Sequence, residues 1–137
     1  QLFSDVVARF GGGVRVVTQT CPGLVERIEA GDLAGPATAA LVRQYLEPLA
    51  REGADTIVLG CTHYPFLAPL IQEVMGPQVR VVDPSEAVAR QVQRVLEGRP
   101  CGGSGQRAFV ATGEPQGLAR AVRHLLGMEV EVERLAM

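Results

Sequence analysis

The sequence predicts an α/β protein built on a doubly wound parallel sheet, and three observations support this class. The chain has 137 residues, of which 47% are hydrophobic, so it is long and apolar enough for one packed domain. Short β-branched runs alternate with longer segments whose apolar residues recur at helical spacing. One run, residues 55–60, has four uninterrupted apolar or β-branched residues before a glycine, which is typical of a strand covered on both faces. Strands that alternate with helices favour right-handed βαβ units.

The elements of the first part follow from local patterns. Residues 2–10 have helical spacing with no start signal before them, so we expect the chain to begin inside a helix and to be a fragment. Residues 14–18 are mostly valine and predict a strand. A short helix is predicted over residues 22–30, and a longer one is predicted to begin at residue 36. Within the second of these, Pro48 predicts either a kink or an early end.

The middle of the chain repeats the strand and helix alternation. The strand at residues 55–60 is followed by a helix that is predicted to begin at Pro65 and to end at Gly76. A further strand over residues 79–83 leads into an amphipathic helix over residues 84–98. These are the βαβ units that define the predicted sheet.

A flexible linker over residues 98–106, rich in glycine, breaks this rhythm. Beyond it we predict a strand at residues 107–113, a helix at residues 114–126 and an alternating, half-exposed edge strand at residues 128–135. This tail is a candidate for a second structural unit.

Composition excludes several classes of function. The formal charge of −2, with no basic run, gives no footprint for nucleic acid or an anionic membrane surface. No apolar stretch approaches the roughly 20 residues of a membrane span, and the start does not resemble a signal peptide. Three cysteines without CxxC spacing fit a reducing compartment, so we expect a cytoplasmic protein. All 13 basic residues are arginine, so no lysine here could hold pyridoxal phosphate as a Schiff base.

The stretch LGCTHYP, residues 59–65, carries the most chemistry. Cys61 follows a predicted strand and precedes a predicted helix, which places it at the carboxyl edge of the sheet, where ligands bind. The start of a helix favours the thiolate form of a nearby cysteine. Thr62 offers a hydroxyl and an N–H to a carboxylate, and His63 can exchange protons with the thiol or with a substrate. The stretch therefore predicts a base or nucleophile.

A purely structural interpretation competes with this one. A lone cysteine after a strand is usually a small buried apolar residue, and a lone histidine there is usually only hydrogen-bonded. On residue types alone that interpretation is slightly ahead, but the combination Gly-Cys-Thr-His before a proline favours function. A metal site is weakly supported, since Cys61 and His63 make two ligands and neither Cys21 nor Cys101 has zinc spacing. Asp83 ends a strand on the same edge, where we prefer a helix-capping role for it.

Residues 53–67, GADTIVLGCTHYPFL, resemble the second cysteine motif of glutamate racemases. The similarity continues through CPGLVERIEAG, YLEPL, VMGP and FVATGEP, at residues 21–31, 45–49, 74–77 and 109–115. The resemblance implies that Cys61 is a catalytic cysteine and that Thr62 and His63 bind substrate, with His63 also tuning or reprotonating the thiol. It also implicates Glu29, which would otherwise be interpreted as a solvated surface charge.

The family resemblance implies cofactor-independent interconversion of L- and D-glutamate for bacterial peptidoglycan, with no metal. Two thiols on opposite faces of the substrate Cα exchange the proton, and Cys61 would be the base for the L enantiomer. Glutamate is the partner expected on this basis, and a homodimer is compatible with it. Two alternatives stay open: a related racemase or decarboxylase of another small acid, such as a hydantoin racemase, and a non-catalytic truncated binding module.

The family fold has two similar α/β lobes with the site between them. Residues 1–90 would then be the second lobe without its first strand, and residues 91–137 the crossing helix, the linker and a segment returning to the first lobe. The sequence contains no asparagine, so the family's Cys-Asn-Thr motif is absent, and we expect the fragment to be inactive alone. Cys21, expected at the end of a parallel strand on the same edge, would approach substrate from the wrong side and is interpreted as structural. Cys101 is interpreted as incidental or as a reactive exposed thiol.

Overall fold

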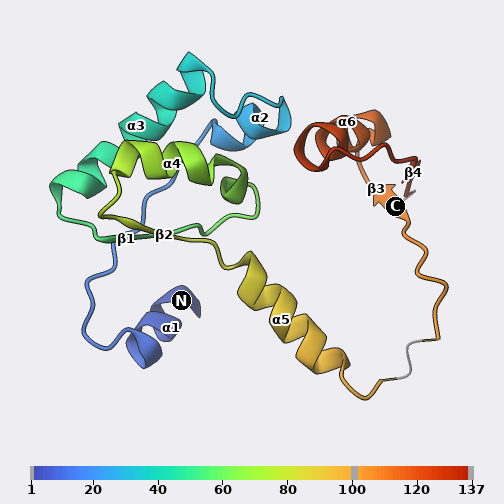
Figure 1. Ribbon diagram of the computed structural model, residues 1–137, viewed down its shortest axis with the longest axis horizontal. Coiled ribbons are helices and arrows are strands. Elements are labelled where there is room, and N and C mark those ends of the chain that lie inside the picture. The colour runs from blue at the N-terminus through green and yellow to red at the C-terminus, as the bar shows by residue number, and fades with distance from the viewer. Residues whose placement is uncertain (1, 100–101, 136–137) are drawn as a thin grey trace.

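The computed structural model describes residues 2–99 and 102–135 and has the predicted mixed α/β architecture (Figure 1). Its strands form two separate two-stranded parallel sheets rather than one continuous sheet. In the first sheet Ile57 pairs with Val81, and in the second Val110 pairs with Glu133. The strands are β1 (Thr56–Val58), β2 (Arg80–Val82), β3 (Phe109–Ala111) and β4 (Val132–Arg134). The parallel class is thus confirmed, and the sheet is incomplete.

The hydrophobic core lies between the first sheet and the helices beside it. Helices α3 (Pro36–Arg51) and α4 (Ala68–Met75) pack together over one face of β1 and β2 (Figure 1). The short helix α2 (Leu24–Glu29) closes one end of this core with Ile28, which is 0% exposed. Other members of the core include Leu24, Val42, Leu46, Leu49, Ile57, Leu59, Leu67, Leu70, Ile71 and Met75.

Helix α3 shows whether Pro48 ends the helix early, which was one of the two effects predicted for this residue. Pro36 occupies the first turn, where a missing N–H is harmless, and the helix continues past Pro48 to Arg51. Pro48 therefore does not end the helix early. Because it lies in the last turn, it removes a backbone hydrogen bond close to a helix end, where few others depend on it.

The predicted strand at residues 14–18 is wrong. This segment forms no strand, and Val14, Val16 and Val17 are between 45% and 65% exposed. A run of valines favours a strand only where a partner strand offers hydrogen bonds and a surface to pack against, and β1 pairs with β2 alone among the described residues. Cys21 consequently does not end a parallel strand, so the premise that placed both thiols at neighbouring strand ends is also wrong.

The C-terminal part crosses away from the core and returns. Helix α5 (Ser85–Leu96) has no buried residue and extends away from the first sheet (Figure 1). It includes residue 90, so the expected boundary between residues 90 and 91 falls inside a helix. After the linker, α6 (Pro115–Leu126) covers β3 and β4 and also contacts α2. In β4, Val132 is half-buried while the next two residues are exposed, as predicted for an edge strand.

The remaining helix, α1 (Leu2–Phe10), precedes the extended segment, and the predicted helix there is confirmed. Among the described residues, no helix combines the length and the apolar character needed to span a bilayer.

Candidate active site

The turn that follows β1 is built by local hydrogen bonds between two buried anchors. The Leu59 N–H donates to the Val82 carbonyl at 3.0 Å, which extends the parallel pairing by one step. The Tyr64 N–H then donates to the Cys61 carbonyl at 3.2 Å and closes a turn. A short 3₁₀ helix, η1 (Tyr64–Leu67), follows and leads directly into α4. Because Leu59 and Leu67 are buried in the core, the turn is held at the carboxyl edge of the sheet.

Within this turn the structure brings three of the sequence-predicted residues into one chain of contacts. The Cys61 Sγ lies 3.9 Å from the Nδ1 of His63, and the His63 Nε2 lies 3.0 Å from the Glu29 Oε1. A carboxylate can only accept hydrogen bonds, so the Nε2 of His63 carries the hydrogen. In the neutral ring the Nδ1 lone pair then faces the Cys61 thiol. The arrangement can therefore accept a proton from sulfur and stabilise the resulting imidazolium beside a carboxylate.

Glu29 is placed by helix α2. Its neighbour Ile28 is fully buried in the core, which turns the following side chain toward the turn that holds His63. The Glu29 side chain is 54% exposed and the His63 side chain 31% exposed, so this hydrogen-bonded pair lies at the mouth of the site. Glu29 is thus a partner of His63 and not simply a solvated charge.

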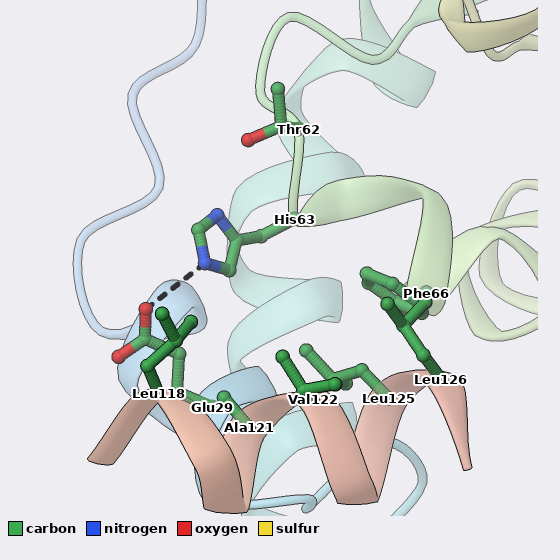
Figure 2. A pocket seen from close by; sticks show the side chains of 9 residues that line it. All are labelled: Glu29, Thr62, His63, Phe66, Leu118, Ala121, Val122, Leu125 and Leu126. Carbon is green, nitrogen blue, oxygen red and sulfur yellow. Dashed lines mark hydrogen bonds and ion pairs between the residues drawn. The ribbon is translucent and has the colours of Figure 1, made fainter. Parts of the chain in front are cut away.

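A hollow of about 230 Å³ opens beside this pair (Figure 2). One wall carries the polar groups of Glu29, Thr62 and His63, together with the ring of Phe66. The opposite wall is the apolar face of α6, made by Leu118, Ala121, Val122, Leu125 and Leu126. Sequence reasoning missed these α6 residues. Their amphipathic spacing predicted a helix with a buried face, but not that the face would lie against the Cys-Thr-His turn.

A second thiol and a phenol lie near the turn. Cys21 and Cys61 are both free and partly exposed. Burial raises the pKa of the Cys21 thiol, the charge of Cys61 adds to this effect, and a hydrogen bond with Tyr64 opposes it. Burial, reinforced by both thiols, raises the pKa of Tyr64 to about 12. At neutral pH, Cys21 and Tyr64 therefore keep their protons.

The remaining candidates have simpler roles. The Asp83 Oδ1 accepts a hydrogen bond from the Ser85 N–H at 2.8 Å, and the Ser85 hydroxyl and N–H lower the pKa of this carboxyl. The capping interpretation of Asp83 is therefore confirmed, at the start of α5. Over residues 2–99 and 102–135, no cluster of three or more His, Cys, Asp or Glu side chains could hold a metal ion. Cys101 lies outside the described residues.

The fold and the site together define an α/β protein with a cysteine, histidine and glutamate chain at the carboxyl edge of a parallel sheet. Residues 1–92 match the model of the Asp/Glu/Hydantoin racemase family. The match spans more than half of the chain, and the chain belongs to this family.

Curated relatives and solved structures agree with this assignment and confirm the resemblance to glutamate racemases. The glutamate racemase of Pseudomonas aeruginosa is 46% identical over 138 residues, which cover 98% of this chain and 52% of that protein. Glutamate racemase isoform RacE1 of Bacillus anthracis superposes with a TM-score of 0.83 at 25% identity, over 99% of this chain and 52% of that one. Escherichia coli glutamate racemase, solved with L-glutamate and the activator UDP-MurNAc-Ala, superposes with a TM-score of 0.80 at 26% identity. The superposition covers 99% of this chain and 53% of that one. The chain spans about half the length of the curated relatives it matches.

Proposed function

We propose that this chain supplies one half of a glutamate racemase, with Cys61 as one of two thiols that exchange the Cα proton without a cofactor. The observation that carries the proposal is the chain of contacts from the Cys61 Sγ through His63 to Glu29. The relatives that the chain matches are glutamate racemases, and one solved neighbour contains L-glutamate.

The geometry suggests how the thiol is activated. His63 accepts the Cys61 proton at Nδ1, and the Glu29 carboxylate stabilises the positive charge that then forms on the ring. The thiolate removes the Cα proton of L-glutamate from one face, and a thiol on the opposite face delivers a proton to give D-glutamate. Thr62, through its hydroxyl and N–H, binds a substrate carboxylate. The reverse reaction uses the same groups with their protonation states exchanged.

The apolar wall of α6 contributes to the chemistry by keeping water away from the reacting groups. The Cα–H of an amino acid is a weak acid, so its removal depends on close placement of the base and on a site that excludes bulk water. The side chains of Val122 and Leu125 lie across the hollow from the His63 and Glu29 pair (Figure 2). A low-dielectric wall there strengthens the electrostatic coupling within the pair.

In this proposal residues 1–90 form the second lobe of the racemase, and residues 91–137 return toward the lobe that the chain does not match. The opposite thiol belongs to that lobe, so the chain alone does not racemise glutamate. The reaction is placed in the cytoplasm, where reduced thiols persist, and its product serves peptidoglycan synthesis.

The test is deuterium incorporation at the Cα of L-glutamate in heavy water. We would measure the chain alone and a chimera in which it replaces the matching 52% of the Pseudomonas aeruginosa racemase, with that parent enzyme as positive control. We expect exchange and racemisation by the chimera and neither by the chain alone. The chimera with Cys61→Ser should lose both activities, whereas Cys21→Ser should retain them.

Two results would contradict the proposal. Racemisation by the chain alone would show that no second lobe is needed. Undiminished activity of the Cys61→Ser chimera would show that Cys61 is not a catalytic base. A panel that includes aspartate, hydantoins and malonate-type acids tests the substrate. Activity confined to one of those acids would replace glutamate as the assignment.

A further inference from the structure

The start of helix α2 is held by a side chain of the neighbouring helix α3. The Tyr45 hydroxyl donates a hydrogen bond of 2.7 Å to the Pro22 carbonyl, two residues before the first residue of α2. Tyr45 is partly buried and packs against the hydrophobic core, so its ring has a fixed place from which the hydroxyl reaches Pro22. Helices α2 and α3 also contact each other (Figure 1). The bond therefore joins the loop before α2 to a helix whose position the core sets.

The chain that enters α2 supplies no equivalent restraint. Residues 14–20 form no strand, so sheet pairing does not fix this segment. Gly23, at the start of α2, has φ of +86° and offers no side-chain cap. Leu24 and Ile28 bury the inner face of the helix, but apolar burial is non-directional, whereas a hydrogen bond fixes both a distance and a direction. Tyr45 thus supplies a directional restraint at this end of α2.

The placement of α2 decides where the Glu29 carboxylate lies. Glu29 is the last residue of this six-residue helix, which is only about 9 Å long, so a shift at its start is carried to its end. The hydrogen bond from the His63 Nε2 to the Glu29 Oε1 is 3.0 Å long. Bonds of this kind span roughly 2.7–3.2 Å, so a displacement of a few tenths of an ångström weakens the contact.

The other partner of this contact belongs to the same frame. His63 directly precedes η1, which leads into α4, and α4 packs against α3. Helix α3 therefore supports both sides of the contact: α4 on the side of His63, and the start of α2 on the side of Glu29. The Tyr45 hydroxyl is the polar link between α3 and the Glu29 side.

We propose that Tyr45 is a positioning residue of the candidate site. Its hydroxyl holds α2 so that Glu29 keeps the hydrogen on the Nε2 of His63 and leaves Nδ1 to face Cys61. Tyr45 acts through Glu29 and does not touch the substrate. The catalytic consequence rests on the proposed function, but the position of the imidazole hydrogen can be measured on the chain without any substrate.

The main experiment determines the tautomer of His63 by long-range proton–nitrogen correlation spectroscopy, at a pH where the imidazole is neutral. The chain has two histidines, and His124→Gln assigns their signals. We expect the parent chain to carry the hydrogen almost exclusively on Nε2, because Glu29 accepts it. Glu29→Ala should populate both tautomers. Tyr45→Phe, which keeps the ring but removes the donor, should move the spectrum part of the way toward that of Glu29→Ala.

A double-mutant cycle and a matched control separate this role from a loss of stability. If Tyr45 acts through Glu29, adding Tyr45→Phe to Glu29→Ala should leave the His63 spectrum unchanged. The control is Gln72→Met. The Gln72 amide donates to the carbonyls of Gly76 and Val79 at 2.7 and 2.9 Å, at the end of α4 away from η1. This variant also loses bonds from a side chain to the backbone, but it should keep the single tautomer.

Kinetics of the racemase chimera give a second measurement. We expect Tyr45→Phe to lower kcat by about threefold to tenfold with KM little changed. When Glu29→Ala is already present, Tyr45→Phe should cause no further loss.

The inference is overturned if Tyr45→Phe leaves His63 with the single tautomer of the parent, if its effect adds fully to that of Glu29→Ala, or if Gln72→Met gives the same mixture. An unfolded Tyr45→Phe chain, detected by circular dichroism, would also overturn it, because the bond would then hold the fold rather than the site. These spectra need no racemase activity. An inactive chimera together with the expected spectra would contradict the proposed function alone.

Discussion

At the scale of single residues, the contact between Glu29 and His63 is the one that would set the direction of proton transfer in the proposed mechanism. The 3.0 Å distance between the Glu29 Oε1 and the His63 Nε2 fixes which ring nitrogen bears the hydrogen, and so leaves Nδ1 to face Cys61. Without this carboxylate the ring could adopt either tautomer, and the proton transfer from sulfur would lose its direction. In the proposed mechanism Glu29 therefore acts through His63, as a positioning residue.

Replacing Glu29 with glutamine in the chimera tests this role. Glu29→Gln keeps the shape of the side chain but removes its charge, so the imidazolium that forms during the reaction loses its partner. We expect kcat to fall by about 10-fold to 100-fold, less than removal of a general base, with KM little changed.

Glu26→Gln is the matched control, because Glu26 is an exposed glutamate on the same helix. It should leave both kinetic constants unchanged. If the two variants behave alike, the contact with His63 has no role in the reaction.

At the scale of elements, the docking of α6 against α2 decides whether the site has its apolar wall. Gly31, two residues after the end of α2, has φ of +80°, and a Cβ built there would lie 3.1 Å from the Nδ1 of His124 on α6. Gly31 therefore serves two purposes: it permits the left-handed turn that ends the helix, and it lets α6 approach closely.

Gly31→Ala and Gly53→Ala separate these two effects. Gly53 has a similar φ of +77° but nothing within 4 Å of a built Cβ, so its substitution introduces only backbone strain. We expect Gly53→Ala to lower the free energy of unfolding by about 1–2 kcal/mol and Gly31→Ala to lower it further. Urea unfolding followed by circular dichroism measures both. Equal losses would show that α6 does not press on Gly31.

The loop between α2 and α3 gives a prediction about pH. The Asp32 Oδ1 accepts a hydrogen bond from the Gly35 N–H at 2.8 Å. The Thr38 hydroxyl, the Gly35 N–H and Arg27 lower the pKa of the Asp32 carboxyl below its ordinary 3.8. Because the folded protein binds this proton less tightly than the unfolded chain, the charged carboxylate stabilises the fold at pH above 3.8, and this stabilisation is lost as pH falls through the lowered pKa.

Asp32→Asn should accordingly lower the urea midpoint at neutral pH, and its difference from the parent chain should shrink as pH falls below 3.8. Asp5→Asn, at an exposed carboxylate of α1, is the control. A difference between Asp32→Asn and the parent chain that stays constant across this range would contradict the role of the Asp32 charge.

At the scale of the whole molecule, the chain exposes an apolar helix face. Val88, Val92, Val95 and Leu96 of α5 are each about half exposed, between 46% and 60%, although their spacing is that of a buried stripe. The structure thus leaves the apolar stripe of this helix open to solvent. Such a surface favours self-association.

Replacing the three valines of the α5 stripe with serine should reduce self-association in sedimentation experiments at raised concentration. It should leave the free energy of unfolding nearly unchanged, because α5 contributes no buried residue. Leu67→Ala, at a fully buried position, should instead cost about 2–5 kcal/mol. Gln91→Ser, on the same helix, controls for the serine itself, and a strictly monomeric parent chain would contradict the prediction.

Predictions of helices, which rest on neighbouring residues, were accurate, whereas the prediction of a strand at residues 14–18 was wrong. Helices such as α3 and α6 were predicted because their apolar spacing and their terminal proline and glycine residues are local signals. The Cys-Thr-His turn was predicted to follow a strand for the same reason. The valines of residues 14–18 led to a wrong prediction because a strand forms only beside a partner strand, and the local pattern does not specify one.

The sequence by itself determined the α/β class, most of the helices and strands, and the presence of Cys61, Thr62 and His63 in one turn between a strand and a helix. Only the tertiary structure decided that Glu29, 34 positions earlier, meets His63, that α6 forms the opposite wall, and that α5 has no buried residue. The physical reason is the distance along the chain over which each kind of interaction acts. Backbone conformation and helical periodicity are set within a few residues, whereas side-chain contacts depend on how buried faces pack across the whole chain.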